Sequence, residues 1–119
     1  MKQNESQLQQ ALMRWWSAAH AGLYCPEELL FAVPNGGVRN IATAVRLKRE
    51  GVRAGVPDLF LAAPNKSSFG LFIELKAGNA GRVSEAQRRM LDLLESHGYA
   101  CVVCRDLDHA IEAITNHLK

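Results

Sequence analysis

Two acidic side chains and a lysine interrupt two strand-like apolar segments of this chain. Asp58 lies within the segment 56–61, and Glu74 and Lys76 lie within the segment 71–76. A charged side chain is rarely buried without a partner or a metal ion, because its removal from water is costly. A carboxylate pair that holds a hard divalent cation, with an ammonium group beside it, has the chemistry to hydrolyse a phosphodiester bond.

Strand geometry predicts how these three residues meet. Side chains alternate between the two faces of a strand, so Glu74 and Lys76 share one face while the apolar residues between them face the core. If the two segments pair as a hairpin, Asp58 lies beside that face. The carboxylates then close on one cation at the ~2.0–2.1 Å that Mg²⁺ requires, with waters in the remaining positions. Lys76 would stay charged and stabilise negative charge on a reacting phosphate.

The alternative is a solvated surface pair of Glu74 and Lys76 on a half-exposed strand. Such a pair is worth about 0–1 kcal/mol and has no functional meaning. Glu-x-Lys is common by itself and favours this alternative. The presence of Gly55-Val56-Pro57-Asp58 in the preceding segment reverses the preference.

Hydrophobic periodicity and turn residues indicate the elements that must position the charged group. Helices are expected at about 3–22 and 40–50, from Ser84 to Gly98, and after Asp106; strands are expected at 29–33, 58–63, 69–76 and 99–104. The order αβαββαβα predicts an α/β fold, with a small mixed central sheet and helices packed on its faces. A length of 119 residues fits one domain, residues 1–119.

Local signals refine the helices. Asn4 is a candidate cap of the first helix, and Ser84 and Gln87 have the spacing of a capping box at the third. The expected apolar faces consist of Leu8, Leu12, Trp15, Trp16, Ala19 and Leu23 in the first helix, of Ala86, Met90, Leu93, Leu94 and His97 in the third, and of Leu107, Ala110, Ile111, Ile114 and Leu118 in the last.

The composition, 48% hydrophobic and 22% charged, is typical of a soluble globular protein. No apolar segment approaches the ~20 residues of a membrane span, and residues 1–5 contain no apolar signal segment. Three cysteines, an odd number, fit a reducing cytoplasm. No phosphate-binding Gly-x-x-x-x-Gly-Lys loop occurs. We therefore expect a cytoplasmic protein without a membrane partner or a nucleotide cofactor.

Cys101 and Cys104 have the spacing of a redox or zinc pair. In a strand, positions three apart lie on opposite faces, so we interpret them as ordinary strand cysteines.

Basic charge is concentrated in residues 35–57, which hold five basic residues and one acidic residue, whereas the net charge of the chain is only +2. A basic block beside an acidic metal site suits a polyanion, although charge alone equally fits a solvated helix face. We expect DNA-backbone contacts from Arg39, Arg46, Lys48 and Arg53, and from Asn35 and Gly36 in the preceding turn. Such contacts give affinity rather than sequence recognition.

Pro57-Asp58 followed by Glu74-Leu75-Lys76 resembles the signature of PD-(D/E)XK nucleases. Together with Pro34-Asn35-Gly36-Gly37, Arg39, Gly55-Val56, Ser84 and Gln87, it is similar to the virus-type replication-repair nuclease domain, VRR-Nuc. The resemblance runs from about residue 30 to residue 104 and, with the flanking helices, covers nearly the whole chain. The single motifs are loose, but their order and spacing together are specific.

The resemblance implies a restriction-endonuclease-like core and a DNA nuclease that depends on Mg²⁺ or Mn²⁺. Asp58 and Glu74 match the metal-binding carboxylates of the family, with the Leu75 main-chain carbonyl as a further ligand. Lys76 matches the catalytic lysine, and Gln87 matches the glutamine of the following helix. Members occur alone in bacteria and phages, which implies the cytoplasm of a bacterium or of a phage-infected host, and as the catalytic domain of a larger eukaryotic repair nuclease.

Two site assignments have alternatives. The capping box explains Gln87 without any chemistry, and both roles are compatible. Glu5 continues the apolar side of the first helix, and related nucleases often supply a glutamate from this helix to the metal. The alternative for Glu5 is an acid stabilised by the helix dipole.

We expect a structure-selective endonuclease that cleaves four-way (Holliday) junctions or other branched DNA in replication, recombination or repair. A homodimer would present two sites to two strands, and related small resolvases are dimers. The alternatives are a flap, splayed-arm or restriction-type nuclease, or a catalytically silent DNA-binding subunit.

Overall fold

The computed structural model describes residues 4–34, 40–79 and 81–119. Its sheet contains β1 (Leu30–Ala32), β2 (Leu59–Leu61), β3 (Leu71–Leu75) and β4 (Ala100–Cys104), in that order. The first three strands are antiparallel neighbours, and β3 and β4 are parallel. The helices are α1 (Glu5–Ala19), α2 (Ile41–Arg49), α3 (Glu85–Ser96) and α4 (Leu107–His117), with 3-10 turns η1 (His20–Leu23) and η2 (Glu27–Leu29) before β1. The predicted element order and mixed sheet are confirmed.

The hairpin of β2 and β3 is closed by a turn that one side chain organises. Asn65 accepts hydrogen bonds from the main-chain N–H groups of Ser67 and Ser68 through Oδ1, and its amide nitrogen lies 3.0 Å from Nδ1 of His117 in α4. Parallel neighbours cannot be joined by such a tight turn, and α3 provides the crossover between β3 and β4.

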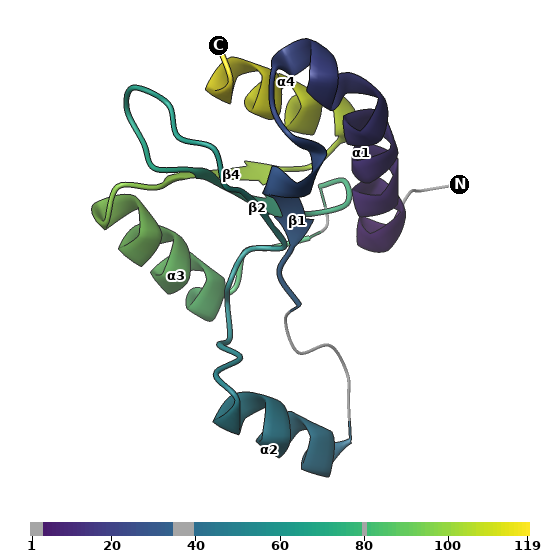
Figure 1. Ribbon diagram of the computed structural model, residues 1–119. Coiled ribbons are helices and arrows are strands. Elements are labelled where there is room, and N and C mark those ends of the chain that lie inside the picture. The colour runs from purple at the N-terminus through teal and green to yellow at the C-terminus, as the bar shows by residue number, and fades with distance from the viewer. Residues whose placement is uncertain (1–3, 35–39, 80) are drawn as a thin grey trace.

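The two faces of the sheet are covered by different helices (Figure 1). The buried core includes Leu8, Leu12 and Trp16 of α1, Ala110 and Ile114 of α4, and Leu59, Leu61, Leu71, Ile73 and Leu75 of the sheet. The opposite face carries α3, which meets β4 where the Cys101 thiol lies 3.8 Å from the Leu91 carbonyl oxygen. Residues that alternate along β3 therefore face either the α1–α4 layer or α3.

The helix boundaries follow the caps. Asn4 and Gln7 form a capping box at α1, Ser84 and Gln87 form one at α3, and Asp106 caps α4. The first helix is shorter than the predicted 3–22, because its last turn tightens into η1 and ends at Tyr24, which has a φ of 56°.

The apolar face of α3 differs from the prediction. Leu91 is its buried residue, whereas Leu93 is 40% exposed and His97 is exposed. Leu91 lies four residues after Gln87 and three before Leu94, so these three residues share one side of the helix. The prediction placed the buried side of the helix around Leu93 instead of Leu91, and this is wrong.

Unlike the other helices, α2 stands apart from the sheet (Figure 1). It has no buried residue, and Ile41 and Val45 are 83% and 44% exposed. The expectation that helices pack on the sheet therefore holds for α1, α3 and α4 only. In the described part of the chain, no helix combines the length and the hydropathy that a membrane span requires.

Candidate active site

The β2–β3 hairpin brings the two predicted carboxylates together. Leu59 pairs with Ile73 in the antiparallel ladder, so the next pair along the same register is Asp58 and Glu74. The Asp58 carboxylate accepts a hydrogen bond of 2.7 Å from the main-chain N–H of Leu75 through Oδ2. This contact fixes the Asp58 side chain against β3, beside Glu74.

Glu74, Lys76 and Gln87 form a closed triangle of contacts. Glu74 Oε2 lies 3.2 Å from Lys76 Nζ and accepts a hydrogen bond of 3.1 Å from the Gln87 amide. Lys76 Nζ in turn donates to Gln87 Oε1 at 3.0 Å. Glu74 and Lys76 are only 2% and 8% exposed, so the surface-pair alternative is wrong.

The Glu74 carboxyl group is held in an environment that opposes its ionisation. Burial and, secondly, the negative charge of Asp58 raise the pKa of Glu74 to about 7, although the hydrogen bond and charge of Lys76 act in the opposite direction. The raised pKa of Glu74 shows that the positive charge near the two carboxylates is too small to keep both ionised, and a bound cation would supply more.

The donor set fits a hard divalent cation. Within the described residues, Glu74 Oε1 is a buried side-chain oxygen without a hydrogen-bond partner. Such an atom is costly to bury unless something pairs with it, and a cation beside Asp58 would do so. The described ranges contain no cluster of three or more Asp, Glu, His or Cys side chains with metal-binding geometry. Two carboxylates would fill only some of the coordination positions of the ion. Main-chain oxygen and water would fill the others, as is common for Mg²⁺.

The Gln87 side chain makes the capping contacts and also reaches the charged group; a direct catalytic role stays a prediction. Its side-chain Oε1 accepts a hydrogen bond of 2.9 Å from the Ser84 main-chain N–H. The main-chain N–H of Gln87 donates to Ser84 Oγ at 3.1 Å, which completes the capping box. The same side chain holds Lys76 and Glu74. The start of α3 is thus connected directly to the charged group.

Glu5 lies at the margin of this group. Its Oε1 is 4.0 Å from Lys76 Nζ, and its side chain is about half exposed, at 53%. The structure therefore brings Glu5 to the lysine. A direct metal contact of Glu5, and one of the Leu75 carbonyl, stay predictions.

Glycine allows a close approach between the segment before β2 and α3. Gly55 has a φ of +85°, and a Cβ atom there would stand 2.4 Å from the Ala86 carbonyl oxygen. The segment that carries Asp58 consequently rests on the first turn of α3, which carries Gln87. The sequence motif Gly55-Val56-Pro57-Asp58 includes Gly55, but no sequence pattern predicts that Gly55 contacts α3.

Arg105 is a second residue without a sequence signal. Its guanidinium donates to the Gly78 carbonyl at 3.0 Å and to the Gly81 carbonyl at 2.6 Å. A Cβ atom on Gly81 would lie 3.3 Å from the side chain of Lys76. Arg105 therefore holds the segment after β3 against the stem of the lysine.

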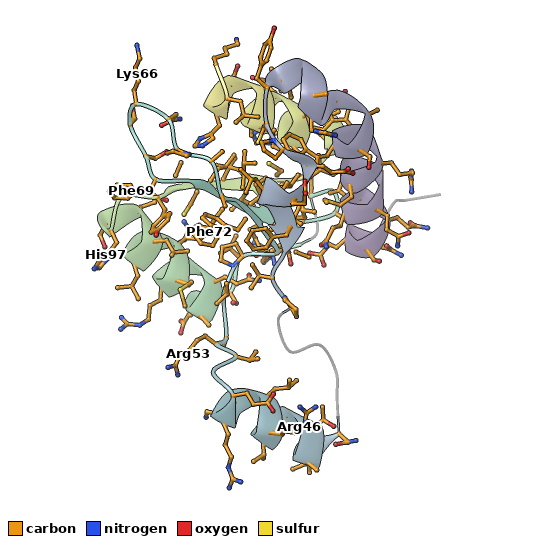
Figure 2. The ribbon with its side chains drawn as sticks, in the orientation of Figure 1. Arg46, Arg53, Lys66, Phe69, Phe72 and His97 are labelled. Carbon is orange, nitrogen blue, oxygen red and sulfur yellow. The ribbon has the colours of Figure 1, made fainter. Side chains whose placement is uncertain are left out.

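The predicted DNA contacts lie elsewhere. Arg46 and Lys48 are on the projecting α2, where Arg46 pairs with Glu50 at 3.1 Å, and Arg53 lies on the segment that leads back to the sheet (Figure 2). No hydrogen bond or ion pair joins these three residues to Asp58 or Glu74 in the described part of the chain. Asn35, Gly36 and Arg39 lie outside the described residues.

The cysteines are free and buried or half-buried. Cys104 belongs to the core between the sheet and the α1–α4 layer, whereas Cys101 faces α3. Burial raises the pKa of Cys101 to about 11 and that of Cys104 to about 12. The prediction of ordinary strand cysteines on opposite faces is confirmed.

Comparison with known proteins agrees with this arrangement. The family model of the VRR-NUC domain matches residues 3–106. A solved structure described as a VRR_NUC domain protein superposes with a TM-score of 0.80 at 24% identity, and the alignment covers 99% of this chain and 90% of that one. No curated protein matches the chain. The predicted fold class, an α/β restriction-endonuclease-like core, is confirmed.

Proposed function

The chain belongs to the VRR-NUC family, whose domain is a nuclease of the PD-(D/E)XK type, and from this premise we propose that it is a divalent-metal-dependent DNA endonuclease of the cytoplasm. The observation that carries the proposal is the carboxylate pair of half-buried Asp58 and buried Glu74. Asp58, immediately before β2, lies beside Glu74 of β3; among the described residues one Glu74 oxygen has no hydrogen-bond partner, and Lys76 Nζ lies 3.2 Å from the other.

Each residue has a role in this proposal. Asp58 and Glu74 would hold Mg²⁺ or Mn²⁺, together with the Leu75 carbonyl and with Glu5 at the margin. The bound ion supplies Lewis acidity and lowers the pKa of coordinated water. Lys76 stabilises the negative charge that develops on the phosphate oxygens.

Gln87 positions the ammonium group of Lys76. Because Gln87 also caps α3, the amide groups at the start of this helix are directed to the same place, where they favour an anion.

The proposed substrate is branched DNA, with four-way junctions first. Asn35, Gly36, Arg39, Arg46, Lys48 and Arg53 would contact DNA, mostly at backbone phosphates, and these contacts do not depend on sequence. Cleavage of two strands requires two sites, which a homodimer supplies. The exposed apolar side chains of α2, Ile41 and Val45, support a contact with a second copy. Flap, splayed-arm and restriction-type cleavage are the alternatives within the nucleases.

A supercoiled-plasmid assay tests the activity. We expect nicking with Mg²⁺ or Mn²⁺, no nicking with a chelator, and loss of nicking in Asp58→Asn and Glu74→Gln. Glu112→Gln, an exposed acidic residue of α4, is the matched control and should stay active.

Full activity of Asp58→Asn with Mg²⁺ would refute the assignment. DNA binding without any cleavage under either ion would favour the silent binding subunit. Labelled four-way, flap, splayed and linear duplexes, cut under the same conditions, rank the substrates.

A further inference from the structure

A row of aromatic side chains crosses the sheet on the face that carries α3. Phe31 of β1, Phe60 of β2 and Phe72 of β3 occupy paired positions of neighbouring strands. The rings of Phe31 and Phe60 meet edge to face, with centroids 5.8 Å apart, and those of Phe60 and Phe72 stack at 4.2 Å. Tyr99 completes the cluster, 5.4 Å from Phe72.

This aromatic row runs parallel to the carboxylate pair. Phe60 comes two residues after Asp58, and Phe72 comes two residues before Glu74, so all four side chains belong to the same face of the hairpin. Two residues of a strand span about 6.4–6.8 Å, so the aromatic row and the carboxylate pair are neighbours on this face.

One end of the row is open. Helix α3 lies over the β4 side of this face, and Phe72 lies between the sheet and α3 (Figure 2). Phe60 and Phe72 are half-buried, whereas Phe31, on the edge strand, is 43% exposed. The Phe31 ring packs edge to face on Phe60, which in turn stacks on Phe72, and part of the Phe31 ring surface stays accessible.

We propose that Phe31, supported by Phe60, stacks on an unpaired nucleobase of the DNA strand whose phosphate lies at Asp58 and Glu74. This inference rests on the proposed nuclease function. Among the branched substrates proposed above, it favours splayed-arm and flap DNA, which carry unpaired nucleotides beside the branch, over the fully paired four-way junction. Bases stack on aromatic side chains without regard to sequence, because every base has a π face. A base inside a duplex is already stacked and is out of reach of such a ring.

The geometry favours a base over a second protein copy at this position. A stable protein interface buries about 800 Å² on each partner. A second copy bound at Phe31 would therefore also cover the carboxylates of Asp58 and Glu74 on the same face. A single exposed ring beside a phosphate site matches the size of one nucleobase.

The test measures binding with the cleavage-deficient Asp58→Asn chain as the parent. One probe is a splayed-arm DNA with 2-aminopurine at the unpaired nucleotides nearest the branch, and the other is the fully paired duplex of the same length. We expect quenching of 2-aminopurine by the parent. Phe31→Ala should lose this quenching and bind the splayed DNA about tenfold more weakly, with the duplex affinity unchanged.

Two substitutions separate stacking from burial. Phe31→Trp should restore binding and quenching, whereas Phe31→Leu, which keeps the apolar volume, should not. The matched control is Phe69→Ala. Phe69 is 66% exposed and contacts Tyr99 at the other end of the cluster, five residues before Glu74, and its loss should leave both DNA affinities unchanged. Circular dichroism checks that each variant is folded.

Equal weakening on both DNAs, or full binding by Phe31→Leu, would overturn the stacking inference and leave the nuclease proposal intact. The same holds if Phe31→Ala changes the mass of the free protein in light scattering, because the ring would then belong to a protein contact. Failure of the parent to bind either DNA would overturn both.

Discussion

The Glu74 side chain couples ionisation to folding. The unfolded chain loses this proton near the ordinary pKa of 4.5, whereas burial and the Asp58 charge hold the pKa of Glu74 at about 7 in the folded chain. Between these values the folded state binds more protons than the unfolded state. The contribution of Glu74 to the free energy of unfolding therefore falls as the pH rises from 4.5 to 7.

Glu74→Gln isolates this effect, because glutamine imitates the protonated carboxyl group. With a chelator present, the stability of Glu74→Gln relative to the natural chain should increase from pH 4.5 to pH 7 and then remain constant. Urea unfolding at several pH values measures it. A difference that does not change with pH would contradict a raised pKa. Mg²⁺ should stabilise the natural chain and not the variant, because the ion binds only the folded carboxylate pair.

The Gln87 side chain contacts both the charged group and the helix cap, and the two contributions can be separated. Gln87→Ala removes the hydrogen bonds to Lys76 and Glu74 and half of the capping box, whereas Ser84→Ala removes only the capping contact. Both should lose about 1 kcal/mol of stability. We expect Gln87→Ala to lower kcat by about tenfold to a hundredfold and to leave KM unchanged, since the lysine acts on the reacting phosphate. Equal kcat losses in both variants would reduce Gln87 to a cap.

For single residues, the sequence predicts the charged residues of the site better than the residues that position them. Asp58, Glu74 and Lys76 stand out because charges rarely interrupt apolar strands. Arg105 acts through main-chain carbonyls of a loop, and such a contact depends on tertiary placement rather than on residue pattern.

At the scale of the elements, Gly55 allows the first turn of α3 to pack closely against the segment that leads into the hairpin. A Cβ atom at this position would press on the Ala86 carbonyl, so Gly55→Ala should both strain the backbone and push away the turn that carries Gln87. Gly51 is the matched control, because its φ is +101° and a Cβ atom there meets nothing within 4 Å. The cost of Gly51→Ala should be about 1–2 kcal/mol, from the backbone conformation alone.

We expect Gly55→Ala to lose more stability than Gly51→Ala and also to lose activity at temperatures where it remains folded. Thermal unfolding and plasmid nicking measure the two effects. Similar values for the two alanine variants would show that the contact with α3 carries no weight.

Helices and strands were predictable because caps and periodicity are local. Asn4, Ser84 and Asp106 mark helix starts through their own side chains. The position of α2 was not predictable in the same way. Its apolar side, with Ile41 and Val45, has the pattern of a buried helix face, and a pattern does not state which surface covers it.

For the whole molecule, this uncovered helix raises the question of assembly. Helices shorter than about 12–15 residues are marginal alone in water and take their stability from packing. α2 has nine residues and none is buried. Its basic residue Arg46 suits DNA, but Ile41 and Val45 do not, because phosphates offer no apolar surface. The proposed second copy of the chain would cover this apolar side and leave the basic side for DNA.

Ile41→Glu combined with Val45→Glu should therefore convert a dimer into a monomer, as measured by light scattering at equal concentration. Each subunit retains its own Asp58, Glu74 and Lys76, so the monomer should still nick plasmid, while paired cuts across a four-way junction should be lost. Arg46→Gln is the control on the same helix. It should keep the mass and reduce the salt dependence of DNA binding by about one counterion. A natural chain that is monomeric, or a double variant of unchanged mass, would contradict this role of α2.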